Sequence, residues 1–278
     1  MNLLSVAPAR TFTLLSIGQR GVGKTVFLAG GYAELHRSGT RTRSRQMWFD
    51  CQNSDSQKNI ENVLSYVEQR GKYPPATLKV TDFDFKLKRQ GLLRAQTLCQ
   101  FCWQDVPGES CHSGDTNFQK TVLASHGCCV FVDAYAAVHD KDYLPRLADI
   151  FKQVSAIASL AYMNGLDYPF AIVFTKCDLL GSEVGGVDPL HRQRLEEGIT
   201  PLTNRLAAVG AHHQVFHSSI PMHTLAGMAQ LEARGGAAPI LWLVHELHKV
   251  YNLGLTDLLM ELLARLLPGR HHSRLAEG

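Results

Sequence analysis

The chain has 278 residues, of which 45% are hydrophobic, so it is long and apolar enough for one large domain, alone or with an appendage. Its formal net charge of +3 is too small to indicate a nucleic-acid partner, and no apolar run approaches the roughly 20 residues that span a bilayer. The seven cysteines lie mostly in apolar runs, which fits reduced thiols in the cytoplasm better than a disulfide framework.

The first predicted element is a strand at residues 11–17, and a glycine-rich loop of the form G-x-x-x-x-G-K-T follows it at residues 18–25. Apolar residues then recur at helical spacing from Val26 onwards. A strand, a glycine loop and a helix form the geometry in which backbone N–H groups surround a phosphate. We therefore expect Lys24 to reach the β- and γ-phosphates and the Thr25 hydroxyl to bind Mg²⁺. The alternative is a glycine-rich turn that caps a helix.

The next stretch contains a basic run, a second helix and a hairpin. The basic run at residues 40–45 is either a solvated loop or a surface for a partner or a phosphate. Ser54 or Asp55 begins the helix, which ends near Gly71. Two extended runs, at residues 79–88 and 92–103, then predict an antiparallel hairpin.

A second candidate phosphate-facing segment follows the hairpin, at Asp105-Val106-Pro107-Gly108. A carboxylate at the C-terminal end of a strand beside a phosphate loop holds Mg²⁺ directly or through water. Gly108 is able to bring its backbone N–H close to a γ-phosphate, because it has no Cβ. The alternative is an ordinary Asp-x-Pro-Gly turn.

Two continuous apolar runs, at residues 127–132 and 169–174, predict buried parallel strands with a long helix at 140–163 between them. The second run ends at Thr175-Lys176-Cys177-Asp178. A carboxylate accepts hydrogen bonds from the N1–H and the exocyclic amine of guanine, a pair of donors that adenine lacks. A lysine stem covers a purine face while its ammonium stays solvated. The segment therefore indicates guanine, and the alternative is a strand-end turn.

The remaining chain predicts a helix at residues 190–209, a short strand at 214–216 and two apolar helices at 239–250 and 255–267. The loop at Ser218 and Ser219 follows the short strand, and its backbone N–H groups are candidates to bind the guanine O6. The apolar helices either pack on the sheet or dock a partner.

The order of these motifs resembles the Ras-like, translation-factor-related class of P-loop GTPases, and within it the bacterial double-GTPase relatives associated with conflict systems. The resemblance covers residues 11–252 and rests on the glycine loop, D-x-P-G and T-K-C-D. It implies a three-layer α/β fold, with a mostly parallel six-stranded sheet, one antiparallel hairpin and helices on both faces. The GTPase domain would span residues 11–252 with a helical insertion at about 39–76, and residues 253–278 would form a C-terminal helix and tail.

The resemblance also implies roles for individual residues. Those implied for nucleotide binding are Gly18, Gln19, Arg20, Gly21, Val22, Gly23, Lys24, Thr25, Val26, Thr175, Lys176, Asp178, Ser218 and Ser219. Those implied for Mg²⁺ are Thr25, Thr77 and Asp105, and those implied for catalysis are Lys24, Arg20, Thr77, Gly108 and Glu109. Thr77 has the place of the first-switch threonine, just before the hairpin, and the less favoured candidates are Thr40, Thr42 and Thr81.

The sequence departs from the Ras-like pattern in three places. About 50 residues, with a helix among them, separate Thr25 from Thr77, where the Ras-like first switch is short. Arg20 occupies a loop position that is usually small, so it acts as a built-in arginine finger, obstructs an external one or points to solvent. Glu109 replaces the glutamine that orients the attacking water and adds negative charge near the γ-phosphate. We therefore expect slow intrinsic hydrolysis.

Two classes of function follow from these motifs. The first is a Mg²⁺-dependent GTPase that acts as a molecular switch with an effector or activator protein. The second is a module that keeps GTP or GDP as a structural ligand and does not hydrolyse it. An ATPase or kinase of another P-loop class is a third hypothesis, against which T-K-C-D argues. The sequence leaves a homo-oligomer open.

Overall fold

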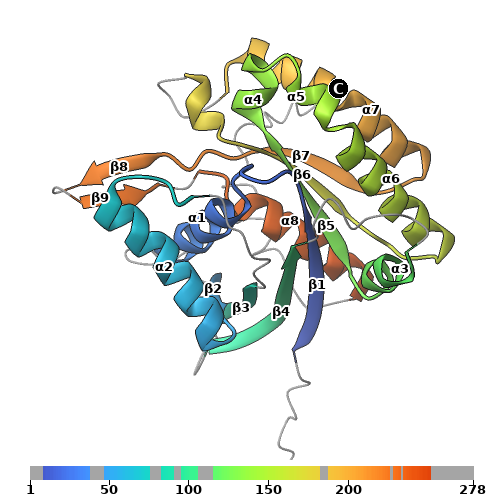
Figure 1. The fold of residues 1–278 in the computed structure, drawn as a ribbon. Coiled ribbons are helices and arrows are strands. Elements are labelled where there is room, and N and C mark those ends of the chain that lie inside the picture. Colours follow the sequence, from blue (N-terminus) through green and yellow to red (C-terminus); the bar gives the residue numbers. More distant parts are fainter. Residues whose placement is uncertain are drawn as a thin grey trace, which may run out of the picture.

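The computed structural model describes residues 9–37, 47–75, 83–90, 95–105, 115–181, 187–225, 228–232 and 234–251. Its centre is a seven-stranded sheet in the order β2-β3-β4-β1-β5-β6-β7 (Figure 1). The strands are β1 (Arg10–Ile17), β2 (Met47–Cys51), β3 (Phe83–Gln90), β4 (Ala95–Asp105), β5 (Gly127–Asp133), β6 (Phe170–Thr175) and β7 (His213–His217). Only β3 runs against the others, because it pairs antiparallel with both β2 and β4. The expected hairpin and mostly parallel sheet are thus confirmed.

The predicted number of six strands is wrong, because β2 lies in the stretch that was expected to hold only a helical insertion. β2 pairs with β3 from Met47 opposite Arg89 to Cys51 opposite Phe85. Met47 and Phe49 are buried and Trp48 is half-buried, which is the alternation of an edge strand with one face on the core. Five residues carry too little alternation to reveal such a strand beside a basic run.

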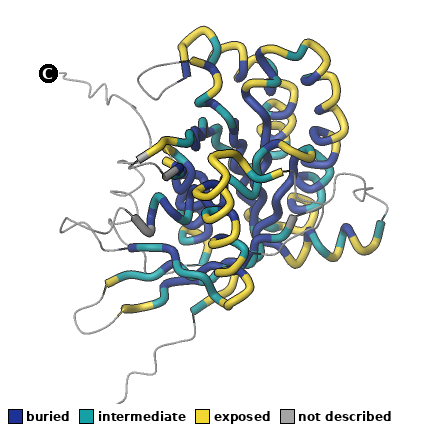
Figure 2. The backbone as a smooth tube through the Cα atoms, turned by 60° about the vertical axis from the view of Figure 1, so that its left-hand side comes forward, coloured by how far each residue is buried: buried dark blue, intermediate teal, exposed yellow. Residues whose placement is uncertain are grey.

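Helices cover both faces of the sheet, which gives three layers (Figure 1). One face packs against α1 (Lys24–Arg37), α2 (Ser54–Arg70) and α8 (Ala237–Tyr251). The other packs against α3 (Thr116–Leu123), α6 (Ala148–Met163) and α7 (Pro189–Ala208). Every residue of β5 and β6 is buried between the two layers, as their continuous apolar runs predict (Figure 2).

The helix expected at residues 140–163 is interrupted. The structure has α4 (Ala134–His139) and α5 (Tyr143–Arg146) before α6. The expected helix begins only at Tyr143, because the Asp140 carboxylate accepts a hydrogen bond from the Asp142 backbone N–H at 2.9 Å in a local turn. It is interrupted at Leu147, whose N–H donates to the Leu144 carbonyl, three residues back instead of four. Two short helices therefore lie after β5, at the C-terminal end of the central strands.

Three smaller features also differ from the prediction or extend it. Asn53, rather than Ser54 or Asp55, caps α2, because its side chain accepts a hydrogen bond from the Ser56 N–H at 2.7 Å. The weakly patterned stretch before α8 contains a hairpin of β8 (Met222–Leu225) and β9 (Met228–Leu231), and α2 packs against β9. The helix expected at residues 255–267 lies outside the described part of the chain.

Close contact between α1 and the start of α8 orients the helix that follows the glycine loop. A Cβ at Gly31 would lie 2.9 Å from the Gly236 carbonyl oxygen, so only glycine permits this approach. The Glu34 carboxylate accepts hydrogen bonds from the backbone N–H groups of Gly235 at 3.2 Å and Ala237 at 2.8 Å. Glu34 thus caps α8 from α1. None of the described helices is long and apolar enough to cross a membrane.

Candidate functional site

The C-terminal ends of β1, β5 and β6 meet at one edge of the sheet. Each is parallel to its neighbour, with Ile17 opposite Val130 and Asp133 opposite Thr175. The glycine loop (residues 18–25), Asp133 and the T-K-C-D segment (residues 175–178) therefore lie side by side. This edge is where open α/β sheets bind ligands.

Two glycines of the loop at residues 18–25 adopt backbone conformations that favour glycine. Gly21 and Gly23 have φ angles of +77° and +99°, which L-residues with a side chain rarely adopt. A Cβ at Gly18 would lie 3.0 Å from the Phe131 carbonyl oxygen. The Lys24 ammonium donates to the Gly18 carbonyl at 2.8 Å and thus lies across the loop. The loop opens into α1, whose first turn holds no acidic residue to repel an anion.

Thr175 connects the glycine loop to the T-K-C-D segment. Its buried hydroxyl lies 2.6 Å from the Val22 carbonyl oxygen, with the Val132 carbonyl oxygen at 3.2 Å as a second acceptor. The hydroxyl is thus hydrogen-bonded inside the protein and places the two segments in direct contact. One ligand with both a phosphate chain and a base would reach both.

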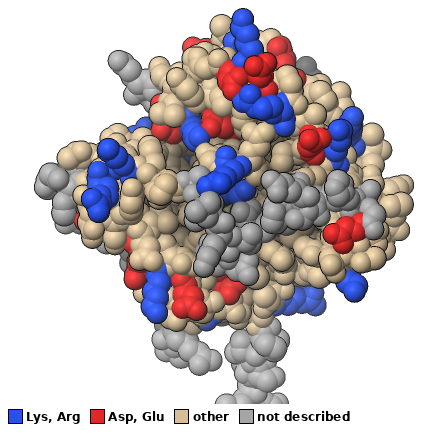
Figure 3. Space-filling model, in the orientation of Figure 1, with Lys and Arg blue, Asp and Glu red and all other residues tan. Residues whose placement is uncertain are grey.

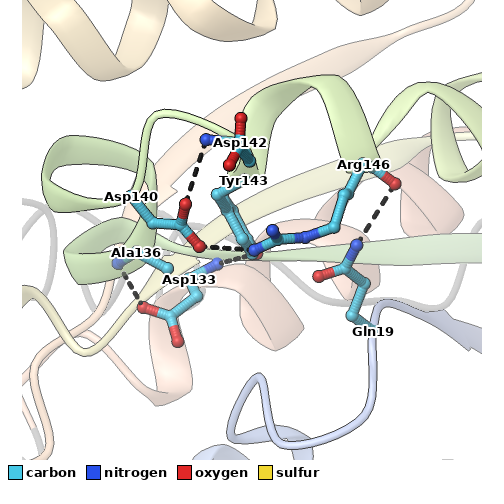
Figure 4. Close-up of polar contacts among 7 residues, drawn as sticks. All are labelled: Gln19, Asp133, Ala136, Asp140, Asp142, Tyr143 and Arg146. Carbon is cyan, nitrogen blue, oxygen red and sulfur yellow. Dashed lines mark hydrogen bonds and ion pairs between the residues drawn. The ribbon is translucent and has the colours of Figure 1, made fainter.

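Lys176 adopts an unusual backbone conformation. Its φ of +57° is the only positive φ of a non-glycine residue among those described. Its ammonium forms an ion pair with the carboxylate of Asp133, a mostly buried residue. The Asp133 carboxylate also caps α4 through the Ala136 N–H at 2.9 Å, and the Asp133 N–H donates to the Tyr143 hydroxyl at 2.8 Å (Figure 4). Two further contacts therefore position Asp133, which pairs with Lys176.

Asp178 lies in η2 (Cys177–Leu180), a single turn of 3₁₀ helix, and its side chain is half-buried. Its Oδ1 accepts a hydrogen bond from the Ile220 backbone N–H at 3.3 Å. The carboxylate is thus presented at the same edge as the glycine loop and is oriented by the loop after β7.

The loop at Ser218 and Ser219 differs from the prediction. The Ser218 N–H donates to the Phe174 carbonyl at 2.8 Å, and the Ser219 N–H donates to the Arg234 carbonyl at 3.0 Å. The Arg234 N–H returns a hydrogen bond to the Ser219 carbonyl at 2.8 Å. Both N–H groups expected for guanine O6 are therefore engaged within the protein, because a distant segment pairs with the loop.

A contact between the glycine loop and α5 was not predicted (Figure 4). The Gln19 side-chain amide donates to the Arg146 carbonyl at 3.2 Å. The Arg146 guanidinium pairs with Asp140 and lowers the pKa of that carboxyl. Arg20, the next residue of the loop, is exposed, as in the solvent-pointing alternative. On the face of the molecule that Figure 3 shows, acidic and basic side chains are interspersed.

The remaining predicted site residues are only partly described. The backbone of Asp105 ends β4 opposite Ser16 of β1, so it lies at the same edge as the glycine loop, but its side chain is not described. Thr77, Gly108 and Glu109 lie outside the described residues, as do the alternatives Thr40, Thr42 and Thr81. Of the three residues predicted to bind Mg²⁺, the structure describes in full only Thr25, which lies at the N-terminus of α1.

No protein-family model matches the chain, and a search of curated proteins gives no match. The residues themselves therefore carry the functional proposal.

The contacts that support the predicted residues were not predicted from the sequence. Asp133 directly follows an apolar run at the C-terminal end of a parallel strand, and that position was the available signal. Arg146 and Ile220 carry no such signal, because only the folded chain brings them to the site.

Proposed function

We propose that the protein binds guanine nucleotides and hydrolyses GTP to GDP and phosphate as a molecular switch. The observation that carries the proposal is the hydrogen bond from the Thr175 hydroxyl to the Val22 carbonyl, at 2.6 Å. It brings the glycine loop into contact with the T-K-C-D segment, and this contact supports a single site for phosphate and guanine. The resemblance to Ras-like GTPases supports the same function.

Each segment has a distinct task in this proposal. The glycine loop surrounds the β-phosphate with backbone N–H groups at the N-terminus of α1, and Lys24 exchanges the Gly18 carbonyl for phosphate oxygens. The Asp178 carboxylate accepts hydrogen bonds from the guanine N1–H and 2-amine, while the Lys176 stem covers the purine face. The bound base and phosphates thus span the edge from β6 to β1.

Magnesium fits the residues at the phosphate end. Thr25 offers a hydroxyl there, and Asp105 and Thr77 are the further ligands that the sequence suggests. A bound Mg²⁺ would neutralise charge that develops on the phosphate oxygens. Glu109 stands where a neutral glutamine would orient water, so intrinsic hydrolysis is slow and an activator protein raises it. The proposed switch would act in the cytoplasm, where thiols stay reduced, and none of the six described cysteines is in a disulfide.

The glutamate also favours a second candidate, a non-hydrolysing scaffold that GTP or GDP stabilises. A carboxylate beside the γ-phosphate repels the charge of the substrate and positions water less well than an amide. In that case the protein binds GTP tightly and its partner recognises the liganded form.

Single-turnover hydrolysis of GTP with Mg²⁺, alongside competition by ATP for binding, tests the proposal. We expect slow conversion of bound GTP to GDP and weak competition by ATP. Asp178→Ala should lose the preference for guanine. The matched control is Asp167→Ala, because the exposed Asp167 precedes β6 at the end of the strand opposite to Asp178.

Two results would change the assignment. Tight GTP binding without turnover, unchanged in Glu109→Ala, would select the scaffold. Equal binding of ATP and GTP by the wild type would contradict the assignment of guanine to Asp178.

A further inference from the structure

Tyr73, at the end of the insertion, contacts the loop that orients Asp178. It follows the C-terminal end of α2, and its hydroxyl donates to the Ile220 carbonyl at 2.9 Å. The Met222 backbone forms a second hydrogen bond with the same hydroxyl. Burial and the nearby Asp178 charge raise the pKa of Tyr73 to about 12, so the hydroxyl keeps its proton and remains a donor at neutral pH.

Ile220 is the residue through which Tyr73 acts on Asp178. The Ile220 carbonyl accepts the bond from Tyr73, while its N–H donates to Asp178 Oδ1 at 3.3 Å. Its side chain packs against α1 so closely that a Cβ at Gly30 would lie 2.7 Å from it. The two polar groups and the side chain of Ile220 therefore contact three different elements.

The bond from the Ile220 N–H determines which way the Asp178 carboxylate faces. With Oδ1 bound by the protein, the carboxylate is held in one rotation about its last side-chain bond, and its plane is set for an incoming pair of donors. Loss of the Tyr73 hydroxyl leaves the Ile220 carbonyl without this donor. The carbonyl belongs to the peptide after Ile220 and the N–H that binds Asp178 to the peptide before it, so the effect reaches the N–H through the backbone of Ile220 itself, which is then freer to shift. The orientation of Asp178 would relax with it.

We propose that Tyr73 is a positioning residue for guanine recognition: through Ile220 it orients the carboxylate that binds the base. The inference rests on the proposed function, since it names a further residue of the same site. It also gives the insertion a role, because Tyr73 belongs to the insertion and connects it directly to the base end of the site.

The test compares GDP with inosine diphosphate, which lacks the 2-amine that Asp178 would bind. Affinities are measured for the wild type, Tyr73→Phe and the control Tyr66→Phe, which removes a hydroxyl from a partly exposed tyrosine of α2. We expect Tyr73→Phe to reduce the preference for GDP by about 3- to 10-fold, the effect of one hydrogen bond. Tyr66→Phe should leave the preference unchanged.

A double-mutant cycle separates positioning from a merely structural role. In an Asp178→Ala background, which has already lost the carboxylate, Tyr73→Phe should cause no further loss of preference. An unchanged preference in Tyr73→Phe would overturn the inference, and so would an equal loss of affinity for both nucleotides. If the wild type and Asp178→Ala behave as proposed while Tyr73→Phe does not, the inference alone fails. If the wild type does not prefer guanine, the proposed function fails as well.

Discussion

At the end of the site that we propose for phosphate, here the phosphate end, the Lys24 ammonium bonds to a carbonyl six residues away in the sequence. At the base end, the Ile220 carbonyl accepts a hydrogen bond from a tyrosine 147 residues away, and Lys176 pairs with an aspartate 43 residues away. Lys24 therefore bonds within its own loop, although Gln19 and Val22 of that loop also have distant partners, whereas the base end is assembled from distant parts of the chain. Closing such long loops costs entropy, so the base end depends on the stability of the whole fold.

Substitutions at the two ends should therefore have different effects on binding and on stability. A change in the glycine loop should remove ligand binding and leave folding intact. A change at the base end should alter selectivity, and some changes there should alter stability with it. Thr175 connects the two ends, because its hydroxyl bonds to the glycine loop. Three predictions test the difference between the ends.

Lys24→Ala should have the largest effect and confine it to binding. We expect the affinity for GDP to fall by about 100-fold or more, because charge-assisted hydrogen bonds to phosphate are lost. The unfolding midpoint without nucleotide should change little, because the side chain is not part of the core. Affinity is measured with a fluorescent GDP analogue, and Lys58→Ala, at an exposed position on α2, is the control. A loss of GDP affinity of less than tenfold would contradict the role of Lys24 at the phosphate end.

His217 should make the base end sensitive to acid. Burial first, and then the charge of Arg192, lower its pKa to about 4. The folded protein thus resists protonation of this imidazole, while the unfolded chain accepts a proton near pH 6.5. The neutral imidazole contributes fully to the free energy of unfolding above about pH 6.5, and this contribution is lost as the pH falls towards 4. At pH 5 the free energy of unfolding is lower by about 2 kcal/mol.

Urea unfolding at pH 7.5 and pH 5 measures this loss. His217→Phe should be less sensitive to acid than the wild type, since a phenyl ring keeps the stacking on Phe174 without the titration. The same substitution at the exposed His139 should leave the sensitivity unchanged. Equal sensitivity of wild type and His217→Phe would contradict the prediction.

Asp133→Asn should have the smallest effect. The amide keeps an oxygen to cap α4 but removes the charge that pairs with Lys176. We expect about fivefold weaker binding of GDP, because the lysine stem is no longer oriented over the purine. Asp149→Asn, which breaks the exposed pair with Lys152, is the matched control. An effect no larger than that of the control would remove Asp133 from the site.

Features that consist of a few consecutive residues could be predicted from the sequence. The glycine loop and T-K-C-D were identified because each consists of a few consecutive residues whose spacing carries the chemistry. The buried strands β5 and β6 were predicted for a similar reason, since their apolar runs need no partner to be recognised. The glycine loop and T-K-C-D were expected to lie near each other, because ligands bind at the C-terminal ends of parallel strands.

Features that depend on tertiary pairing were missed. β2 is a five-residue edge strand whose place depends on β3, and the β8–β9 hairpin packs on α2. The N–H groups of Ser218 and Ser219 were expected to face a ligand, yet Arg234 and β6 accept their hydrogen bonds. The helix expected at residues 140–163 begins late because of a turn at Asp140 and is interrupted by a turn at Leu147, and helical periodicity reveals neither.

The central claim is that Asp178 selects guanine, and Asp178→Asn tests it by exchanging one base for another. A carboxylate accepts hydrogen bonds from the N1–H and the 2-amine of guanine. Xanthine carries a carbonyl oxygen in place of the amine, and an asparagine amide offers one acceptor and one donor to match it.

The measurement is the affinity of the wild type and of Asp178→Asn for GDP and for xanthosine diphosphate. We predict that the wild type prefers GDP and that the variant prefers xanthosine diphosphate, with each preference of about tenfold or more. A variant that loses affinity for both nucleotides equally, or a wild type that binds both equally, would contradict the account.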